Sequence, residues 1–133
     1  MKKMFFVCLT LLLASCQEPY EKAIDEYYQS HLHDPSSYEL VKMVGPDSVT
    51  VTSAAVDMFL MQTDLTDEVR TLGLTRYLLQ LKSKGKDVDA FVGYRFIHEY
   101  RAKNKVGALT LHRDLIYFDK TMTKIADVQQ YGK

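Results

Sequence analysis

Four histidines are the residues of this chain that first suggest chemistry, because a neutral imidazole is a good ligand for zinc. They are His31, His33, His98 and His112. H-E-x-x-H and similar ligand spacings do not occur among them. His31 and His33 stand two residues apart at a predicted helix end, where their side chains point in different directions. The sequence therefore predicts neither a metal nor another cofactor.

The serines and carboxylates also lack a catalytic motif. No G-x-S-x-G elbow is present, and the six scattered glycines form no phosphate-binding loop. Paired carboxylates could meet in the fold, but no spacing singles out a pair. We therefore predict no catalytic residue and expect a protein that is not an enzyme. The enzymatic alternative, a small hydrolase, would need a cleft with converging Asp, Glu or His side chains.

Cys16 carries the most specific chemical signal, because it follows a segment typical of secretion. Lys2 and Lys3 precede an uncharged run over residues 4–13, about half the length that spans a bilayer. The residues Leu13-Ala14-Ser15-Cys16 then resemble the lipobox of bacterial lipoproteins. The alternatives are a plain signal peptide with a chance cysteine, and a buried N-terminal helix.

The lipobox resemblance implies cleavage before Cys16, a diacylglyceryl group on its sulfur and acylation of the new amino terminus. Two or more acyl chains anchor a protein stably, whereas one does so only marginally. The expected organisation is a signal peptide over residues 1–15, a lipidated tether over 16–19 and a single small domain over 20–133. Gln17 replaces the Asp that retains such proteins in the inner membrane. This favours the outer membrane, facing the periplasm, with surface exposure left open.

The charge balance argues against nucleic acid as a partner. Without Lys2 and Lys3, 15 basic residues stand against 17 acidic ones, a net charge of −2. With Cys8 in the signal and Cys16 acylated, the domain has no thiol for a disulfide or a metal site. Its stability must therefore come from a hydrophobic core.

Arg95, Arg101 and Lys103 are the candidate binding residues, because strand alternation places them on one face of a predicted hairpin. Lys105 and Arg113 extend this basic patch. We expect the patch to be exposed, where it would suit anionic lipid, lipopolysaccharide or glycan. The alternative is a solvated sheet face whose charges prevent edge-to-edge pairing.

Two amphipathic helices must help to position these residues. Apolar residues recur at spacings of three and four over 20–32, and Pro35 limits that helix. Thr66 suits the N-cap of another helix, which has an apolar face and ends near Gly85. Residues 54–62 suit either a helix or a buried strand, and the sequence leaves this open.

Strands are predicted between and after the helices. One runs over 38–44, turns at Gly45-Pro46-Asp47 and returns over 48–52. Alternation from residue 92 begins a hairpin, and residues 124–128 form a last strand. The predicted fold class is α+β, with helices packed on one face of an antiparallel β-meander.

A four-residue turn over 104–107 would pair Lys103 with Ala108 and fix the register of the hairpin. Glu99 would then lie opposite His112, and one face would be apolar. In this register His98 and His112 point to opposite faces. The apolar pairs would be Tyr94–Tyr117, Phe96–Leu115, Tyr100–Leu111 and Ala102–Leu109.

Two segments together resemble a group of small exported proteins and lipoproteins of bacteria. They are His33-Asp34-Pro35-Ser36-Ser37-Tyr38-Glu39, after the first helix, and Tyr100-Arg101-Ala102-Lys103-Asn104, running to Gly107. The resemblance covers about a third of the domain and implies a helix followed by a sheet. It implies no activity and no catalytic residue.

These observations predict a non-enzymatic, membrane-anchored module of the bacterial envelope. Its lipid would hold it on the membrane, and the exposed sheet face and hairpin tip would bind an envelope protein or glycan. The alternative is a small inhibitor or immunity-type lipoprotein that blocks a toxin or hydrolase. The sequence does not predict the oligomeric state.

Overall fold

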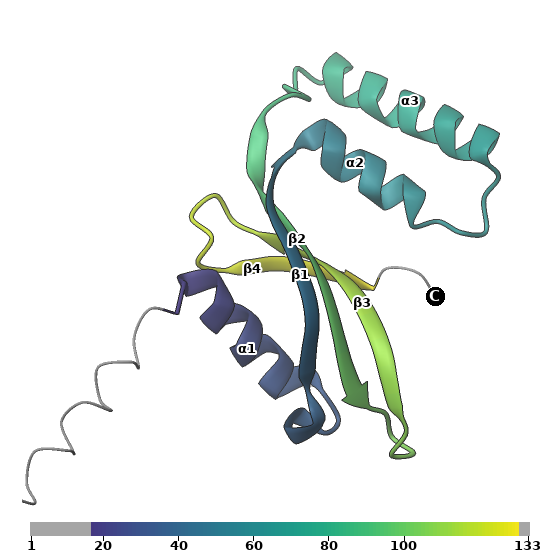
Figure 1. Ribbon diagram of the computed structural model, residues 1–133. Helices are drawn as coiled ribbons and strands as arrows, with labels where there is room; N and C mark the ends of the chain where they lie inside the picture. The colour runs from purple at the N-terminus through teal and green to yellow at the C-terminus, as the bar shows by residue number, and fades with distance from the viewer. Residues whose placement is uncertain (1–16, 131–133) are drawn as a thin grey trace, which may run out of the picture.

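The structure, a computed structural model, describes residues 17–130 (Figure 1). In this range three α-helices accompany a four-stranded antiparallel sheet with the order β1-β2-β3-β4. The predicted α+β class with a meander sheet is therefore confirmed. The predicted signal peptide and the predicted lipidation of Cys16 lie outside the described residues. Among the helices of residues 17–130, none combines the length and apolar character needed to cross a membrane.

Helix α1 (Pro19–His31) packs its apolar stripe on one face of the sheet. Proline fits its first turn, where the missing N–H has no helical partner. The Glu18 amide donates to the Glu21 carboxylate over 3.2 Å, which fixes the start of the helix. Ile24 and Tyr28, one turn apart, are buried. A 3₁₀ turn, η1 (Pro35–Ser37), follows α1 and begins at Pro35, the residue that was predicted to limit this helix.

The predicted turn at Gly45-Pro46-Asp47 is wrong, because these residues lie inside a single strand, β1 (Glu39–Thr50). The chain does not reverse there but continues along β2 (Phe91–Lys103), with a register shift between Val44 and Asp47. A Cβ at Gly45 would lie 2.7 Å from the Arg95 carbonyl oxygen, and its φ is +131°. Only glycine allows this approach, and proline, which lacks an N–H, fits a bulge. The turn residues thus form a bulge inside one strand.

Two helices connect β1 to β2 and project from one end of the sheet (Figure 1). They are α2 (Val51–Leu60) and α3 (Asp67–Ser83). The Thr50 side chain accepts from the Ser53 amide, so residues 54–60 are helical, and Thr66 caps α3 as predicted. However, α3 has no buried residue, because α2 is its principal neighbour.

The hairpin of β2 and β3 (Leu109–Phe118) has a register one residue away from the predicted one. Lys103 pairs with Leu109, and Tyr100 pairs with His112. The loop has five residues, because Asn104 N–H bonds Ala108 O over 3.0 Å. The Asn104 side-chain oxygen also accepts from the Val106 and Ala108 amides. These two hydrogen bonds close a loop that is one residue longer than predicted. As a result the even-numbered residues of β3, and not the odd-numbered ones, face α1.

The core lies between α1 and the sheet, whose last strand is β4 (Ile125–Gln130). Phe96, Tyr100, Ile116 and Phe118 fill it from the two central strands. The register also places His98 and Asp114, a cross-strand pair, in this buried face. The predicted apolar pairs are therefore wrong, namely Tyr94–Tyr117, Phe96–Leu115, Tyr100–Leu111 and Ala102–Leu109.

Candidate functional site

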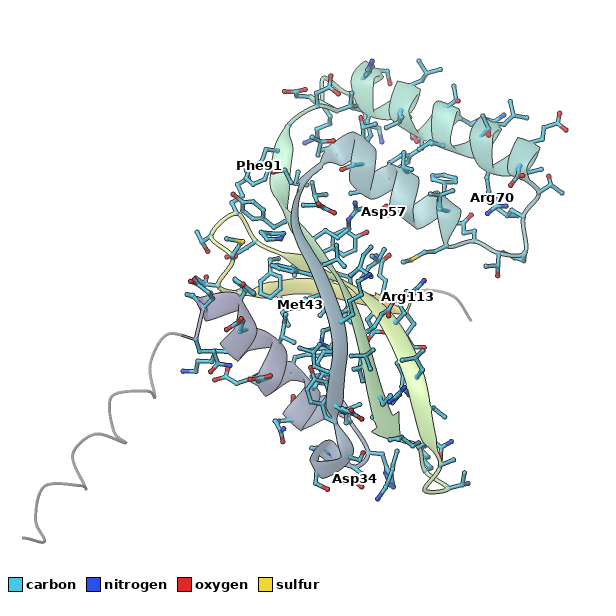
Figure 2. All side chains as sticks on the ribbon, viewed as in Figure 1. Asp34, Met43, Asp57, Arg70, Phe91 and Arg113 are labelled. Carbon is cyan, nitrogen blue, oxygen red and sulfur yellow. The ribbon has the colours of Figure 1, made fainter. Side chains whose placement is uncertain are left out.

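A cleft of about 530 Å³ lies between the C-terminal end of α1 and the β2–β3 hairpin. The end of α1 contributes Tyr27 and His31, and β2 contributes Tyr100. His33, Lys103 and Lys105 line it and also line a neighbouring hollow of about 400 Å³, beside Asp34. Figure 2 places Asp34 at this end of the molecule, near the tip of the β2–β3 hairpin. We call the larger hollow the tip cleft.

Two stacked ring pairs line the tip cleft. The rings of Tyr27 and His31 lie 4.0 Å apart at an interplanar angle of 13°. These residues are one turn apart on α1, which is the spacing that brings side chains together. The rings of Tyr100 and His112 lie 5.0 Å apart at 16° across the β2–β3 pair. The cleft therefore offers aromatic faces on both its helix side and its sheet side.

Beneath these rings lies a buried polar network. The Tyr28 hydroxyl donates to the Asp114 carboxylate over 2.7 Å. Burial, and then this hydrogen bond, raise the pKa of Tyr28 above its ordinary value. Burial likewise raises the pKa of Tyr100, with the nearby Asp114 carboxylate adding to the rise. The Asp114 carboxylate is thus engaged by tyrosine, and the network fixes the floor of the cleft.

His98 lies beside this network but does not line the cleft. Its side chain is fully buried, and its Nε2 lies 2.8 Å from the Tyr38 hydroxyl. Burial lowers the pKa of His98 to about 4, although the Asp25 carboxylate opposes the shift. At neutral pH the imidazole is therefore uncharged, and it stacks on Tyr28 at 4.7 Å.

The segment over residues 33–39 and the start of the β2–β3 loop meet at the mouth of the cleft. The Lys103 amide donates to Ser37 Oγ over 2.8 Å, which joins β2 to η1. The same Ser37 hydroxyl donates to the Asp34 carbonyl oxygen over 2.7 Å. One turn of 3₁₀ helix thus holds the hairpin against the end of α1.

The structure separates the three predicted binding residues. Lys103 is exposed and lines the tip cleft, and Arg101 is exposed with a guanidinium nitrogen 4.0 Å from Glu39. The expectation of an exposed side chain is wrong for Arg95, because it forms ion pairs with Asp57 of α2 and with Asp47. Figure 2 shows Asp57 between α2 and the sheet. Arg95 therefore joins the helical hairpin to the sheet.

The histidine geometry also differs from the prediction. His98 and His112 share one face of the sheet, because the register differs by one residue. Glu99 lies opposite Arg113, whose Nε donates to its carboxylate over 2.7 Å, and not opposite His112. Within residues 17–130 no three His, Cys, Asp or Glu side chains are grouped to hold a metal ion.

Sequence reasoning missed Tyr27, Tyr100, His112 and Asp114 as residues of one site. The only signal was the Asn104-x-x-Gly107 loop, because its true length decides which face His112 and Asp114 occupy. Comparison with family models, with curated proteins and with solved structures gives no match. The tip cleft must therefore be interpreted from its own chemistry.

Proposed function

We propose that the protein is a non-enzymatic binding module of the bacterial envelope, anchored by lipid on Cys16, which holds an anionic ligand in the tip cleft. A glycan or lipid head group with carboxylate or phosphate is the chemical class that fits. The observation that carries the proposal is the excess of basic side chains over carboxylates in the lining of the cleft, beside its stacked rings.

The ionisable side chains that line the cleft support an anionic ligand. Besides tyrosines, they are His31, His33, Lys103, Lys105, His112 and Asp114. Lys103 and Lys105 supply positive charge at the mouth, and the one carboxylate is engaged by Tyr28. Cations in a partly enclosed site strengthen the attraction for an anion. Stacked aromatic faces add apolar contact area at little cost in side-chain entropy.

The contacts of the nearby hydroxyls support a binding role over catalysis. Ser30 Oγ lies 2.8 Å from His31 Nδ1, but it also contacts the carbonyl oxygens of Tyr27 and Glu26. Thr110 Oγ1 lies 2.7 Å from His112 Nε2 and 3.2 Å from the Ala102 carbonyl oxygen. A hydroxyl that donates to a backbone carbonyl does not present its proton to a base, so neither pair has the arrangement of an activated nucleophile.

In-cell photo-crosslinking tests the proposal. A photo-reactive residue placed at Lys103 or Lys105 should capture the same envelope component. The matched controls are Lys84 and Lys86, which are exposed lysines beyond α3. Equal capture from all four positions would contradict a site at the cleft. Capture of a single toxin or hydrolase would favour the inhibitor alternative.

Charge reversal tests the chemistry of the ligand. The double change Lys103→Glu and Lys105→Glu should reduce retention of the protein on immobilised lipopolysaccharide at least tenfold. Added salt should likewise reduce the retention of the parent protein. Lys84→Glu with Lys86→Glu adds the same charge elsewhere and should change little. Retention that is insensitive to salt and to the first pair would refute an anionic ligand.

A further inference from the structure

Helix α3 leaves an apolar stripe uncovered on its outer side. Val69, Leu72 and Leu79 are 50%, 62% and 62% exposed. With Arg76 between them, their spacings of three and four place them on one face of the helix. Figure 2 shows side chains of α3 projecting on the side away from α2 and the sheet.

The other side of α3 packs on α2, so the two helices form a unit with one inner seam. At this seam Gly73 faces Phe59, and a Cβ on Gly73 would lie 2.7 Å from the ring. Leu60 of α2 is also 58% exposed. Two helices bury only one seam between them, so the outer face of α3 stays open to another helix packed against it.

The charges of α3 are arranged to complement a second, antiparallel α3. Asp67 and Glu68 lie in its first turn, and Lys82 lies in its last turn. This order follows the helix dipole within one chain. When two copies run antiparallel, the acidic start of each also meets the basic end of the other. A lipid surface would leave Glu68 without such a partner, whereas Asp67 pairs with Arg70 of its own helix.

We propose that a second copy of this chain covers the α3 stripe. The two copies are related by a twofold axis that passes between their antiparallel α3 helices at the level of residue 74. In this register Val69 packs against the partner's Leu79, and Leu72 packs on the stem of the partner's Arg76. Glu68 lies between the partner's Lys82 and the partner's Arg76. The interface is isologous, since both copies use the same surface. The α2–α3 pairs of the two copies then place four helices side by side in the order α2–α3–α3–α2.

Photo-crosslinking of the full-length chain in cells tests this arrangement. A photo-reactive residue at Val69 should give a product of twice the chain mass, with the crosslink mapped by mass spectrometry near the partner's Leu79. The matched control is Val106, an 86% exposed apolar residue of the β2–β3 loop, which should give no such product.

Charge exchange makes the test specific to the antiparallel register. Glu68→Lys and Lys82→Glu should each lower the yield of the Val69 dimer at least fivefold. The two changes in one chain should restore it, because each pair re-forms with opposite polarity. A yield unaffected by the single changes, or not restored by the double change, overturns the proposal. So does a crosslink from Val69 to lipid or to a different protein in place of the dimer.

Discussion

The hydroxyl of Tyr38 and Nε2 of His98 lie 2.8 Å apart, although the two residues are 60 positions apart in the chain. Tyr38 follows η1, and His98 lies in the centre of β2, under α1. The contact therefore joins the start of the sheet to its buried face. It also holds the titratable imidazole of His98 in a buried position, where a positive charge is costly.

His98 should make the fold sensitive to mild acid. Its pKa falls to about 4 in the folded protein, whereas the unfolded chain binds a proton near pH 6.5. The unfolded state therefore binds more protons between these values, and stability decreases as the pH falls through this window. Between pH 7 and pH 5 the expected loss is about 2 kcal/mol.

Urea unfolding at pH 7 and at pH 5 measures this loss. His98→Phe keeps an aromatic ring against Tyr28 and removes the titration, so the difference between the two pH values should shrink. His33→Asn, an exposed control, should leave the difference as it is in the parent protein. A His98→Phe variant with the full acid sensitivity would refute this explanation.

Asp57→Ala should weaken the attachment of the helical hairpin to the sheet. The Asp57 carboxylate binds Arg95 and accepts from the Tyr117 hydroxyl over 2.8 Å, and it is 12% exposed. Its removal leaves a mostly buried guanidinium without its main partner, at a cost of about 2–3 kcal/mol. Thermal unfolding measures the cost. Asp67→Ala, which removes the exposed ion pair with Arg70, should cost less than about 0.5 kcal/mol.

Ser37→Ala should loosen the hairpin tip from η1. It removes the acceptor of the Lys103 amide and the donor to the Asp34 carbonyl, so we expect a loss of about 1–2 kcal/mol. Ser36→Ala is the matched control, because the hydroxyl of this exposed residue bonds the Asp34 side chain and its loss should cost less. Hydrogen exchange at Lys103 should accelerate in the first variant alone. Unchanged exchange at Lys103 would show that the hydrogen bond does not hold the tip.

Asn104→Ala should destabilise the β2–β3 hairpin by about 1–2 kcal/mol, because two loop amides lose their acceptor. Lys105→Ala, in the same loop but exposed, should be nearly neutral. Urea unfolding of both variants at pH 7 compares them. Equal stability of the two would mean that the backbone alone sets the five-residue loop.

Local patterns were sufficient to predict α1, α3 and the fold class, but they left α2 open between a helix and a strand. The spacing of Tyr20, Ile24 and Tyr28 predicted α1, and Thr66 marked the start of α3. Both signals act within one or two turns, where nearby residues decide the structure. The same reasoning did not reveal that α3 lies largely exposed, since amphipathic spacing does not say what covers the apolar face.

The register and the site depended on contacts that local patterns do not contain. Strand β3 has leucines at 109, 111 and 115 on one face and Ile116 and Phe118 on the other, so both registers bury large apolar groups. The Asn104 side chain decides between them by closing a longer loop. Gly45 and Pro46 likewise suit a turn or a bulge, and the neighbouring β2 determines which one forms. One residue of slip moves His112 and Asp114 to the other face.

The α2–α3 pair leaves and re-enters the sheet at adjacent positions. Thr50 and Phe91 are cross-strand partners, and the Val51 amide bonds the Ala90 carbonyl oxygen over 3.2 Å. The forty intervening residues are therefore an insertion within a β-hairpin, held to the sheet at its two ends and by the ion pair between Asp57 and Arg95. An insertion of this kind can change in length without shifting the register of β2 and β3, provided that it keeps a partner for Arg95. Self-association and ligand binding would then be free to diverge separately in descendants of this chain.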